Sequence, residues 1–423
     1  MSQFYGTFSP YTSNSATSYK LPVTPPTRSG ESRKSDLERF SVSQPSEGPL
    51  LGILTKTQSA LVSQGIKRHI LRDTASDLLP KERVTKCGKN RISKDKPRSV
   101  MYSQQHQTCH YSNVQNCGSV WICPCCSGRI SQKRRDELTQ ASKRWIDFHG
   151  GQTLLLSLTN RHHAEMPLRW HRAGQRKAMK YFWGDRRGKV IFELLRRVHH
   201  VTAHEITHGR NGWHPHHHVL LFVDNPTEDL SFIEHELKLH WINCCKKAGL
   251  PLPTLQVGLD LRDGTQAAGY ISKWGMAEEM TLGHLKKAKG KGVTPFQLLE
   301  IASGVGGGEG APTTTEQRAE SRKLFQEYGV VYKGTRQLSW SRGSKAALLI
   351  DDKTDQQLAD ETNKESIELH KVTDTVFTLL CRYRLTGQYL YACAFDHNHD
   401  TELVFGIVSH VVNLEINRLR KLE

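Results

Sequence analysis

Four histidines within five consecutive positions form the densest group of side chains able to do chemistry in this sequence. They lie in the run WHPHHHVLLF, at residues 213–222. In a strand, alternate side chains share a face, so His214, His216 and His218 point one way. His217 points to the opposite face. Two imidazoles at this spacing can chelate one divalent ion, and the alternative is a histidine-rich surface strand. We therefore expect a metal site where this strand begins.

A carboxylate ligand for the same ion is expected from the segment HEIT, at residues 204–207. If residues 209–212 form a four-residue hairpin loop, Glu205 falls opposite His216 on the same face. A loop one residue longer or shorter would turn Glu205 to the other face. A site with histidine and carboxylate ligands and open positions suits Mg²⁺ or Mn²⁺ acting on a phosphate better than it suits a closed structural zinc.

A second reactive group follows in GTQAAGYISKWG, at residues 264–275, where small residues leave Tyr270 uncrowded. If this segment is helical, Lys273 lies on the same face as Tyr270. An ammonium group there would lower the pKa of the phenol or stabilise charge on a phosphate. A tyrosine on an amphipathic helix more often packs into a core. The interpretation of Tyr270 as a nucleophile therefore depends on the presence of the histidine strand.

A cysteine cluster precedes both motifs. Cys117, Cys123 and Cys126 form a C-x5-C-x2-C array, and the C-x2-C half suits tetrahedral Zn²⁺. We expect Cys109, eight residues before Cys117, as the fourth ligand of a structural zinc. A metal-free buried cluster is the alternative interpretation. Other residues that can supply the fourth ligand are Cys87, His106 and His110.

The charge of the chain indicates a polyanionic partner. The 423 residues carry a formal net charge of +17, which favours nucleic acid or an anionic membrane. Apolar runs are too short to span a bilayer, and the first residues lack the features of a signal peptide. Clustered cysteines are typical of metal ligation in a reducing compartment, so we expect a cytoplasmic protein. The basic span 81–98 fits a solvated loop or a DNA-facing arm equally well, and residues 132–135 can lie against phosphates.

The elements that must position these residues form an antiparallel α+β pattern. Residues 153–159, TLLLSLT, read as a buried strand, and residues 201–207 and 213–223 as a hairpin. The predicted fold is therefore an antiparallel sheet with flanking helices, preceded by a small zinc-binding module. Helices are expected at residues 131–145, 234–248 and 265–274, with an extended segment at 258–261.

Composition suggests five parts along the chain. Residues 350–369 are acidic and helix-prone, whereas 370–410 mix aromatic and β-branched residues, as a small strand-bearing unit would. Residues 303–315 form a linker of Gly, Pro and Thr. The five parts are a disordered tail at 1–60, a basic arm with the cysteine module at 61–145, a nuclease domain at 146–300, a linker and basic extension at 301–350, and a small C-terminal region of unknown role at 351–423.

The order of these motifs resembles that of the HUH endonucleases, and in particular the rolling-circle replication initiators (Rep proteins) of small staphylococcal plasmids. The resemblance covers residues 83–351. LLLSLT is similar to the first motif of that family, ITHGRNGWHPHHHVLLF to its metal motif and AAGYISKW to its nucleophile motif. CGSVWICPCC, followed by RISQKRRDEL, is similar to the cysteine segment that precedes the nuclease.

The resemblance implies a role for five residues: His216 and His218 as metal ligands, Glu205 as an acidic ligand, Tyr270 as nucleophile and Lys273 as its helix partner. The chain departs from the family pattern in two places. The residue between the paired ligands is usually apolar, but here it is His217, which leaves a register that uses His214 open. Relatives with one tyrosine carry a glutamate one helical turn earlier, where this chain has Gln266.

The implied reaction is transesterification at a DNA phosphate through a 5′-phosphotyrosine, which leaves a free 3′-hydroxyl to prime replication. Gln266 cannot act as a general base, so Asp263 is expected to activate water for the closing step, or a second protomer supplies its own Tyr270. The expected partners are single- and double-stranded origin DNA, a host polymerase and, since the sequence has no GxxxxGK[ST] loop, a host helicase. The route in which a second protomer supplies its own Tyr270 requires a homodimer. No membrane partner is expected.

Four other functions share parts of the pattern. A relaxase usually carries its tyrosine ahead of the histidines, and here the tyrosine follows them. A transposase of the same chemistry stays open, because the target DNA cannot be read from the protein. A zinc-ribbon regulator would bind DNA without cutting it, whereas a zinc hydrolase lacks an H-E-x-x-H pair.

Overall fold

The structure is a computed structural model that describes residues 56–225, 229–263, 292–304, 313–361, 365–399 and 402–422. Most of the expected tail at 1–60 lies outside these residues. The helix expected at 265–274, with Tyr270, Lys273 and Gln266, lies outside them too, as does most of the linker expected at 303–315.

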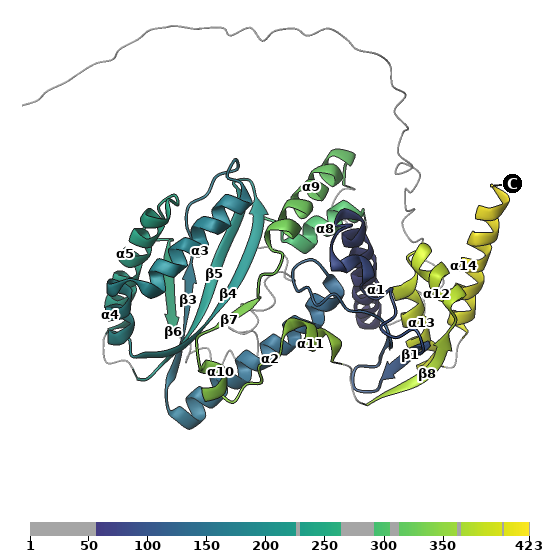
Figure 1. Ribbon diagram of the computed structural model, residues 1–423, viewed down its shortest axis with the longest axis horizontal. Coiled ribbons are helices and arrows are strands. Elements are labelled where there is room, and N and C mark those ends of the chain that lie inside the picture. The colour runs from purple at the N-terminus through teal and green to yellow at the C-terminus, as the bar shows by residue number, and fades with distance from the viewer. Residues whose placement is uncertain are drawn as a thin grey trace, which may run out of the picture. The chain divides into compact units, whose positions relative to one another are not determined.

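Helices and strands alternate along the described residues (Figure 1). The helices are α1 (Lys56–Leu78), the 3-10 helix η3 (Arg83–Lys86), α2 (Pro124–His149), α3 (Leu168–Gly184), α4 (Arg186–Leu194), α5 (Leu230–Ala248), α8 (Pro295–Ser303), α9 (Thr315–Val331), α10 (Ser344–Ala347), α11 (Asp355–Asp360), α12 (Asp374–Arg382), α13 (Thr386–His399) and α14 (Leu403–Arg420). The strands are β1 (Arg98–Ser103), β2 (Thr108–Tyr111), β3 (Gln152–Leu158), β4 (Arg197–Gly209), β5 (Gly212–Val223), β6 (Leu259–Asp263), β7 (Leu338–Trp340) and β8 (Ser366–Val372).

Strands β3 to β7 form an antiparallel sheet in the order β6-β3-β5-β4-β7. Because β3 and β5 are apolar on both faces, each face needs a covering layer. Helices α3, α4 and α5 cover one face, where Leu156 and Leu221 share a buried cluster with Phe182 (Figure 1). On the other face Leu220 shares a cluster with Trp145 of α2. The predicted α+β fold, an antiparallel sheet with flanking helices, is confirmed.

Strands β4 and β5 form the hairpin that the histidine run predicts. Their pairing continues to Gly209 opposite Gly212, which gives the same register as the expected four-residue loop. Gly212 has a φ of +80°, and a Cβ there would lie 3.0 Å from the backbone of Ala164, so glycine suits this turn for both reasons. Glu205 consequently lies opposite His216, and the predicted register is confirmed.

The cysteine segment lies in a core that several helices build together. Leu71 of α1, Ile130 of α2 and Phe325 of α9 belong to one buried cluster that also contains cysteines. Ile206 and Trp213, from the β4–β5 hairpin, belong to the same cluster. The cysteine segment and the histidine hairpin therefore share one hydrophobic core.

The C-terminal residues differ from the strand-bearing unit that the sequence predicts. Residues 370–410 were expected to be strand-bearing, but β8 ends at Val372 and α12, α13 and α14 follow. Thr373 caps α12, its side chain accepting from the backbone N–H of Val376, and the buried Phe377 and Leu380 then recur at helical spacing. Tertiary packing outweighs the strand preference of the aromatic and β-branched residues here. Strand β8 completes a second sheet, in the order β2-β1-β8.

None of the helices that the structure describes is both long enough and apolar enough to cross a membrane. The longest, α2, carries charged residues along its length, including the run KRRDE.

Candidate metal centres

Glu205, His216 and His218 converge on one face of the sheet. Oε2 of Glu205 lies 3.0 Å from Nε2 of His216 and 2.9 Å from Nε2 of His218. One potential ligand atom from each residue lies within 4.8 Å of the others, so a single ion can bind all three. Strand alternation puts the two histidines on one face, and the hairpin register brings the carboxylate to them.

Each imidazole has a partner on the ring nitrogen that faces away from Glu205. Nδ1 of His218 lies 3.0 Å from Oγ of Ser157, and Nδ1 of His216 donates to the carbonyl oxygen of His214 at 3.4 Å. Partners of this kind fix the tautomer of metal-bound histidines. When the proton is on Nδ1, the Nε2 lone pair of His216 can bind a divalent cation beside the Glu205 carboxylate. The three side chains therefore fit a divalent metal ion.

The carboxylate of Glu205 is ionised. Burial raises the pKa of Glu205, but the adjacent imidazoles of His216 and His218 outweigh burial and hold the pKa well below its usual range. The side chains of Glu205 and His216 are 21% and 18% exposed, whereas that of His218 is 6% exposed. Two imidazoles and one carboxylate, open to solvent on one side, leave coordination positions for a phosphate oxygen or water.

The other two histidines of the run do not belong to the ligand group, although the ring centroid of His214 lies 5.1 Å from that of His216. Nε2 of His214 lies 2.8 Å from Oγ1 of Thr159, and the ring stacks on His162 at 4.6 Å between centroids. Burial lowers the pKa of His214 to about 3, so the ring is neutral. His217 is 3% exposed on the opposite face, against His204. The structure thus brings His216 and His218 to Glu205 and leaves His214 outside the group.

The sheet register brings two further residues near the centre. Ser157 contacts His218, and Asp260 of β6 pairs directly with Ser157. Asp263, the last residue of β6, pairs with Leu154, farther along the strand. The alternation of strand 153–159 was the signal in the sequence that would have identified Ser157 as a neighbour of the histidines.

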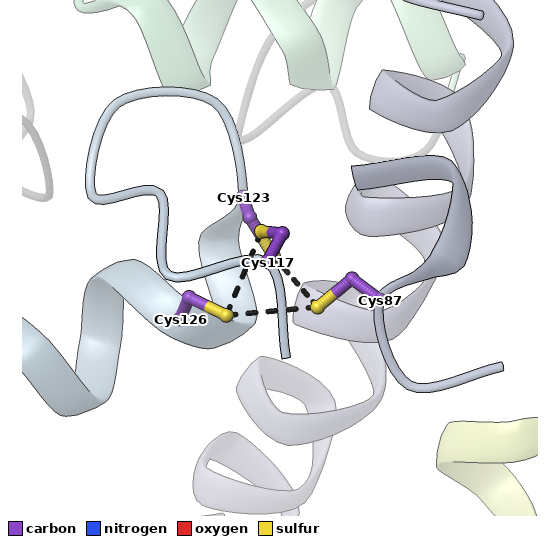
Figure 2. A group of neighbouring side chains, drawn as sticks. All are labelled: Cys87, Cys117, Cys123 and Cys126. Atoms are coloured by element: carbon purple, nitrogen blue, oxygen red, sulfur yellow. Dashed lines mark hydrogen bonds between the residues drawn. The ribbon is translucent and has the colours of Figure 1, made fainter. Parts of the chain in front are cut away.

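The second centre consists of four buried cysteines, Cys87, Cys117, Cys123 and Cys126 (Figure 2). Sγ of Cys87 lies 3.6 Å from Sγ of both Cys123 and Cys126, and Sγ of Cys117 lies 3.7 Å from that of Cys126. Four sulfur atoms bound tetrahedrally to zinc at about 2.3 Å lie about 3.8 Å apart. The cluster therefore has the dimensions of a structural zinc site.

The choice of Cys109 as the fourth cysteine is corrected by this geometry, because Cys87 occupies that place. The backbone N–H of Gly88 donates to the carbonyl oxygen of Gln115 at 2.7 Å, which holds Cys87 beside the segment that carries Cys117. Cys109 instead lies in β2 and packs against the hydrophobic cluster of the C-terminal helices, where burial raises its pKa to about 12.

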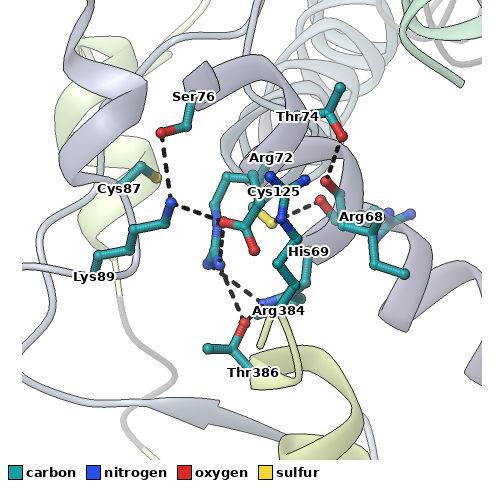
Figure 3. Close-up of polar contacts among 12 residues, drawn as sticks. Arg68, His69, Arg72, Thr74, Ser76, Cys87, Lys89, Cys125, Arg384 and Thr386 are labelled. Atoms are coloured by element: carbon teal, nitrogen blue, oxygen red, sulfur yellow. Dashed lines mark hydrogen bonds and ion pairs between the residues drawn. The ribbon is translucent and has the colours of Figure 1, made fainter. Parts of the chain in front are cut away.

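A buried polar network lies beside the four cysteines (Figure 3). Arg72 of α1 is 2% exposed, and its Nη2 donates to Oδ1 of Asp73 at 2.9 Å and to Oγ1 of Thr386 at 3.1 Å. Gly88 has a φ of +66°, and a Cβ there would lie 2.4 Å from Nη1 of Arg72. Four thiolates around Zn²⁺ leave a net negative charge, which this guanidinium lies close enough to stabilise. Nζ of Lys89, two residues after Cys87, lies 3.1 Å from Oδ1 of Asp73, so the network joins this segment to the start of α13.

Zinc content is expected to distinguish Cys87 from Cys109. The full chain should hold one zinc after mild chelation, and Cys87→Ser, Cys123→Ser and Cys126→Ser should each lose it and unfold at lower temperature, because a structural zinc contributes to folding. Cys109→Ser is the matched control and should keep its zinc. Metal analysis combined with thermal unfolding tests this, and loss of zinc in Cys109→Ser but not in Cys87→Ser would contradict it.

A hydrogen bond links the histidine hairpin to helix α9, which shares the hydrophobic core around the cysteines. Nε1 of Trp213 donates to Oε2 of Glu327 in α9 at 2.9 Å, and the backbone N–H of Leu168 donates to Oε1 of the same carboxylate at 3.1 Å. Trp213 directly precedes the histidine run. Packing around the cysteines therefore supports the strand that carries His216 and His218.

Comparison with known proteins found two relatives. Protein rep of Streptomyces lividans is 28% identical over 297 residues, which cover 56% of this chain and 64% of that protein. A neomycin resistance protein of Streptomyces cyanogenus is 33% identical over 137 residues, which cover 26% of this chain and 31% of that protein. The chain thus spans less than two thirds of each relative. No family model and no solved structure matches it. Over about half its length, the chain is similar to a Rep-named protein.

Proposed function

We propose that this chain is a plasmid rolling-circle replication initiator that nicks and rejoins one DNA strand. The convergence of Glu205, His216 and His218 on one face of the sheet, partly open to solvent, is the observation that carries the proposal. The similarity to Protein rep supports the replication role, and the net charge of +17 supports binding to DNA. The motif order, which resembles HUH endonucleases, supports the nicking chemistry.

The proposed reaction uses residues of this chain in defined roles. Glu205, His216 and His218 hold Mg²⁺ or Mn²⁺, which supplies charge stabilisation at the scissile phosphate. The phenol oxygen of Tyr270 forms a bond to phosphorus while the bond from phosphorus to the 3′ oxygen breaks. The phenol releases its proton to solvent, and the leaving 3′ oxygen takes one up. Lys273 stabilises the negative charge on the phosphate.

The length of chain supports this role for Tyr270. The register puts Asp263 opposite Leu154, three residues along β3 from Ser157, which contacts His218. Asp263 on β6 therefore lies about 10 Å from His218 along the strand direction. Across the sheet, the two residues are separated by two strand spacings, which is about 10 Å. Tyr270 follows Asp263 by seven residues, and an extended chain of that length spans up to about 24 Å.

The experiment that tests the proposal uses the full chain, Mn²⁺ and single-stranded fragments of the DNA that flanks its gene. A fragment labelled at its 3′ end should form a covalent adduct with the protein. The same fragment labelled at its 5′ end should instead yield a shorter free product with a 3′-hydroxyl. A chelator should abolish both products. A DNA-binding regulator would retain the fragments without forming either one.

The proposed partners are those that would use the nicked DNA strand. The 3′-hydroxyl primes a host polymerase, and a host helicase unwinds the duplex, since the sequence has no phosphate loop of the GxxxxGK[ST] type. Single- and double-stranded origin DNA are the substrates. The cysteine centre holds Zn²⁺ in a structural role.

Closure of the cycle is expected to depend on Asp263. We propose that its carboxylate orients water for the final step, and that a homodimer with two Tyr270 side chains is the alternative. Asp263→Asn should slow release of closed circles in a strand-transfer assay while the first nick proceeds normally. Mixing wild-type and Tyr270→Phe chains separates the routes. Normal closure by Asp263→Asn, combined with failure of the mixed chains, would favour the dimer.

A further inference from the structure

A cavity of about 900 Å³ lies between the cysteine centre and edge strand β7. Three segments line most of it: residues 117–122 beside the cysteines, residues 332–341 around β7, and residues 350–355 before α11. Its volume is at the upper end of the range of ligand pockets, about 300–1,000 Å³. The histidine and carboxylate centre described above does not contribute to this lining.

The cavity lies close to the metal face of the sheet. Leu338, one of its lining residues, pairs with Ala203, and Ala203 pairs with His218. Opposed residues in an antiparallel sheet point to the same side, so Leu338 and His218 share a face. Two strand spacings separate them, which is about 10 Å. The cavity and the group formed by Glu205, His216 and His218 therefore lie on the same side of the sheet, about two strand spacings apart.

The lining carries more positive than negative charge. Acidic lining residues pair with three of the basic ones: Glu82 with Lys333 at 2.8 Å, Asp355 with Arg134 at 2.7 Å, and Asp352 with Lys345 at 3.1 Å. Lys353 pairs with Glu361 at 2.7 Å. Arg83 and Arg336 form no ion pair within 4.0 Å among the residues that the structure describes; the pKa of Asp352 is lowered mainly by Lys345 and more weakly by Arg336. Arg83 donates to the neutral side chain of Gln356 at 2.8 Å.

These two arginines come from the two sides of the cavity. Arg83 lies in η3, close to the cysteine centre, and Arg336 lies just before β7. Both are exposed, so a ligand can reach them. A guanidinium binds phosphate oxygens through two parallel hydrogen bonds, which makes arginine the preferred residue for phosphate recognition.

An aromatic ring completes the lining. Trp340 is partly exposed, its Nε1 is buried with no hydrogen-bond partner, and Nζ of Lys345 lies 5.6 Å from the centroid of its ring. Basic residues interleaved with aromatic rings are typical of single-strand binding surfaces, where bases stack on the rings. In a duplex the base faces are covered by neighbouring bases, so only a single strand can offer one to Trp340.

We propose that this cavity binds the single-stranded DNA next to the scissile phosphate. Arg83 and Arg336 contact backbone phosphates, and Trp340 stacks on a base. The inference rests on the proposed function, because it takes DNA to be the substrate of the adjacent metal centre. It adds a binding subsite that holds the strand in position for cleavage.

The test measures binding without cleavage. Fluorescence anisotropy with a labelled single-stranded oligonucleotide is recorded in chelator over a series of salt concentrations. The double variant Arg83→Gln, Arg336→Gln should bind about tenfold more weakly or worse. Its slope of log affinity against log salt should fall in magnitude by about 1.4, since each phosphate contact on a single strand contributes about 0.7. Trp340→Leu should weaken binding at least about fivefold with an unchanged slope.

The matched control is Arg169→Gln, Arg186→Gln, which removes two exposed arginines from α3 and α4, on the opposite face of the sheet. This variant should keep the wild-type affinity and slope. Thermal unfolding of every variant checks that the fold is unchanged. Equal affinity and slope in wild type and the Arg83, Arg336 variant would overturn the proposal. Competition by polyglutamate as effective as that by the oligonucleotide would overturn it too, because the cavity would then be a site for acidic peptides.

The outcome is independent of nicking. If binding depends on Arg83, Arg336 and Trp340 as expected but no covalent adduct forms with Mn²⁺, the proposed nicking activity is wrong and the cavity still binds single strands. If the adduct forms and the cavity variants bind and cleave as wild type does, the nicking activity stands and the cavity proposal fails.

Discussion

His218→Ala is expected to reduce metal-dependent DNA cleavage by about a thousandfold, and His216→Ala by a similar factor. Each variant removes one of three side chains that converge within 4.8 Å. A bound metal stabilises a phosphoryl transition state by several kcal/mol, and each 1.4 kcal/mol corresponds to a factor of ten in rate. Cleavage is measured as the rate of 3′-labelled adduct formation in Mn²⁺, alongside Mn²⁺ affinity by calorimetry.

His217→Ala is the matched control, because it lies between the two ligands but faces the opposite side of the sheet. His217 is buried against His204, so the variant should unfold at a lower temperature. Below that temperature it should bind Mn²⁺ and cleave DNA within about tenfold of wild type. Full loss of Mn²⁺ binding in His217→Ala, with normal binding in His216→Ala, would contradict the strand register.

Tyr270→Phe is expected to abolish both the covalent adduct and nicking, a loss on the order of 10⁴-fold or more. The substitution removes only the hydroxyl group that the proposed mechanism assigns as the nucleophile. Origin binding in chelator should stay at the wild-type level, since the charges that contact DNA are untouched. Gel analysis of 3′-labelled DNA measures the adduct, and anisotropy measures binding.

Tyr181→Phe provides the control for loss of a tyrosine hydroxyl elsewhere, because Tyr181 lies in α3 on the opposite face of the sheet. It should nick as wild type does. An adduct that persists in Tyr270→Phe would assign the nucleophile to another residue, and peptide mapping of that adduct would identify it.

The sequence by itself determined the features that depend on local geometry. Strand alternation put His216 and His218 on one face, and a loop at residues 209–212 aligned Glu205 with them, a register that the structure confirms. The C-x2-C spacing brought Cys123 and Cys126 together at the start of α2. These contacts arise between residues close in the chain, whose relative positions follow from backbone dihedral angles and turn length.

Tertiary structure alone decided the features that depend on distant segments. Cys87 rather than Cys109 joins the cysteine centre, because a backbone hydrogen bond from Gly88 to Gln115 closes a long loop, whereas pairing of β1 with β2 and β8 takes Cys109 to another core. The residues after Val372 became helical because they bury an apolar face against that second sheet. The cavity beside β7 arises where segments far apart in sequence meet. Spacing along a chain does not report which loops close, since closure depends on the free energy of packing between remote surfaces.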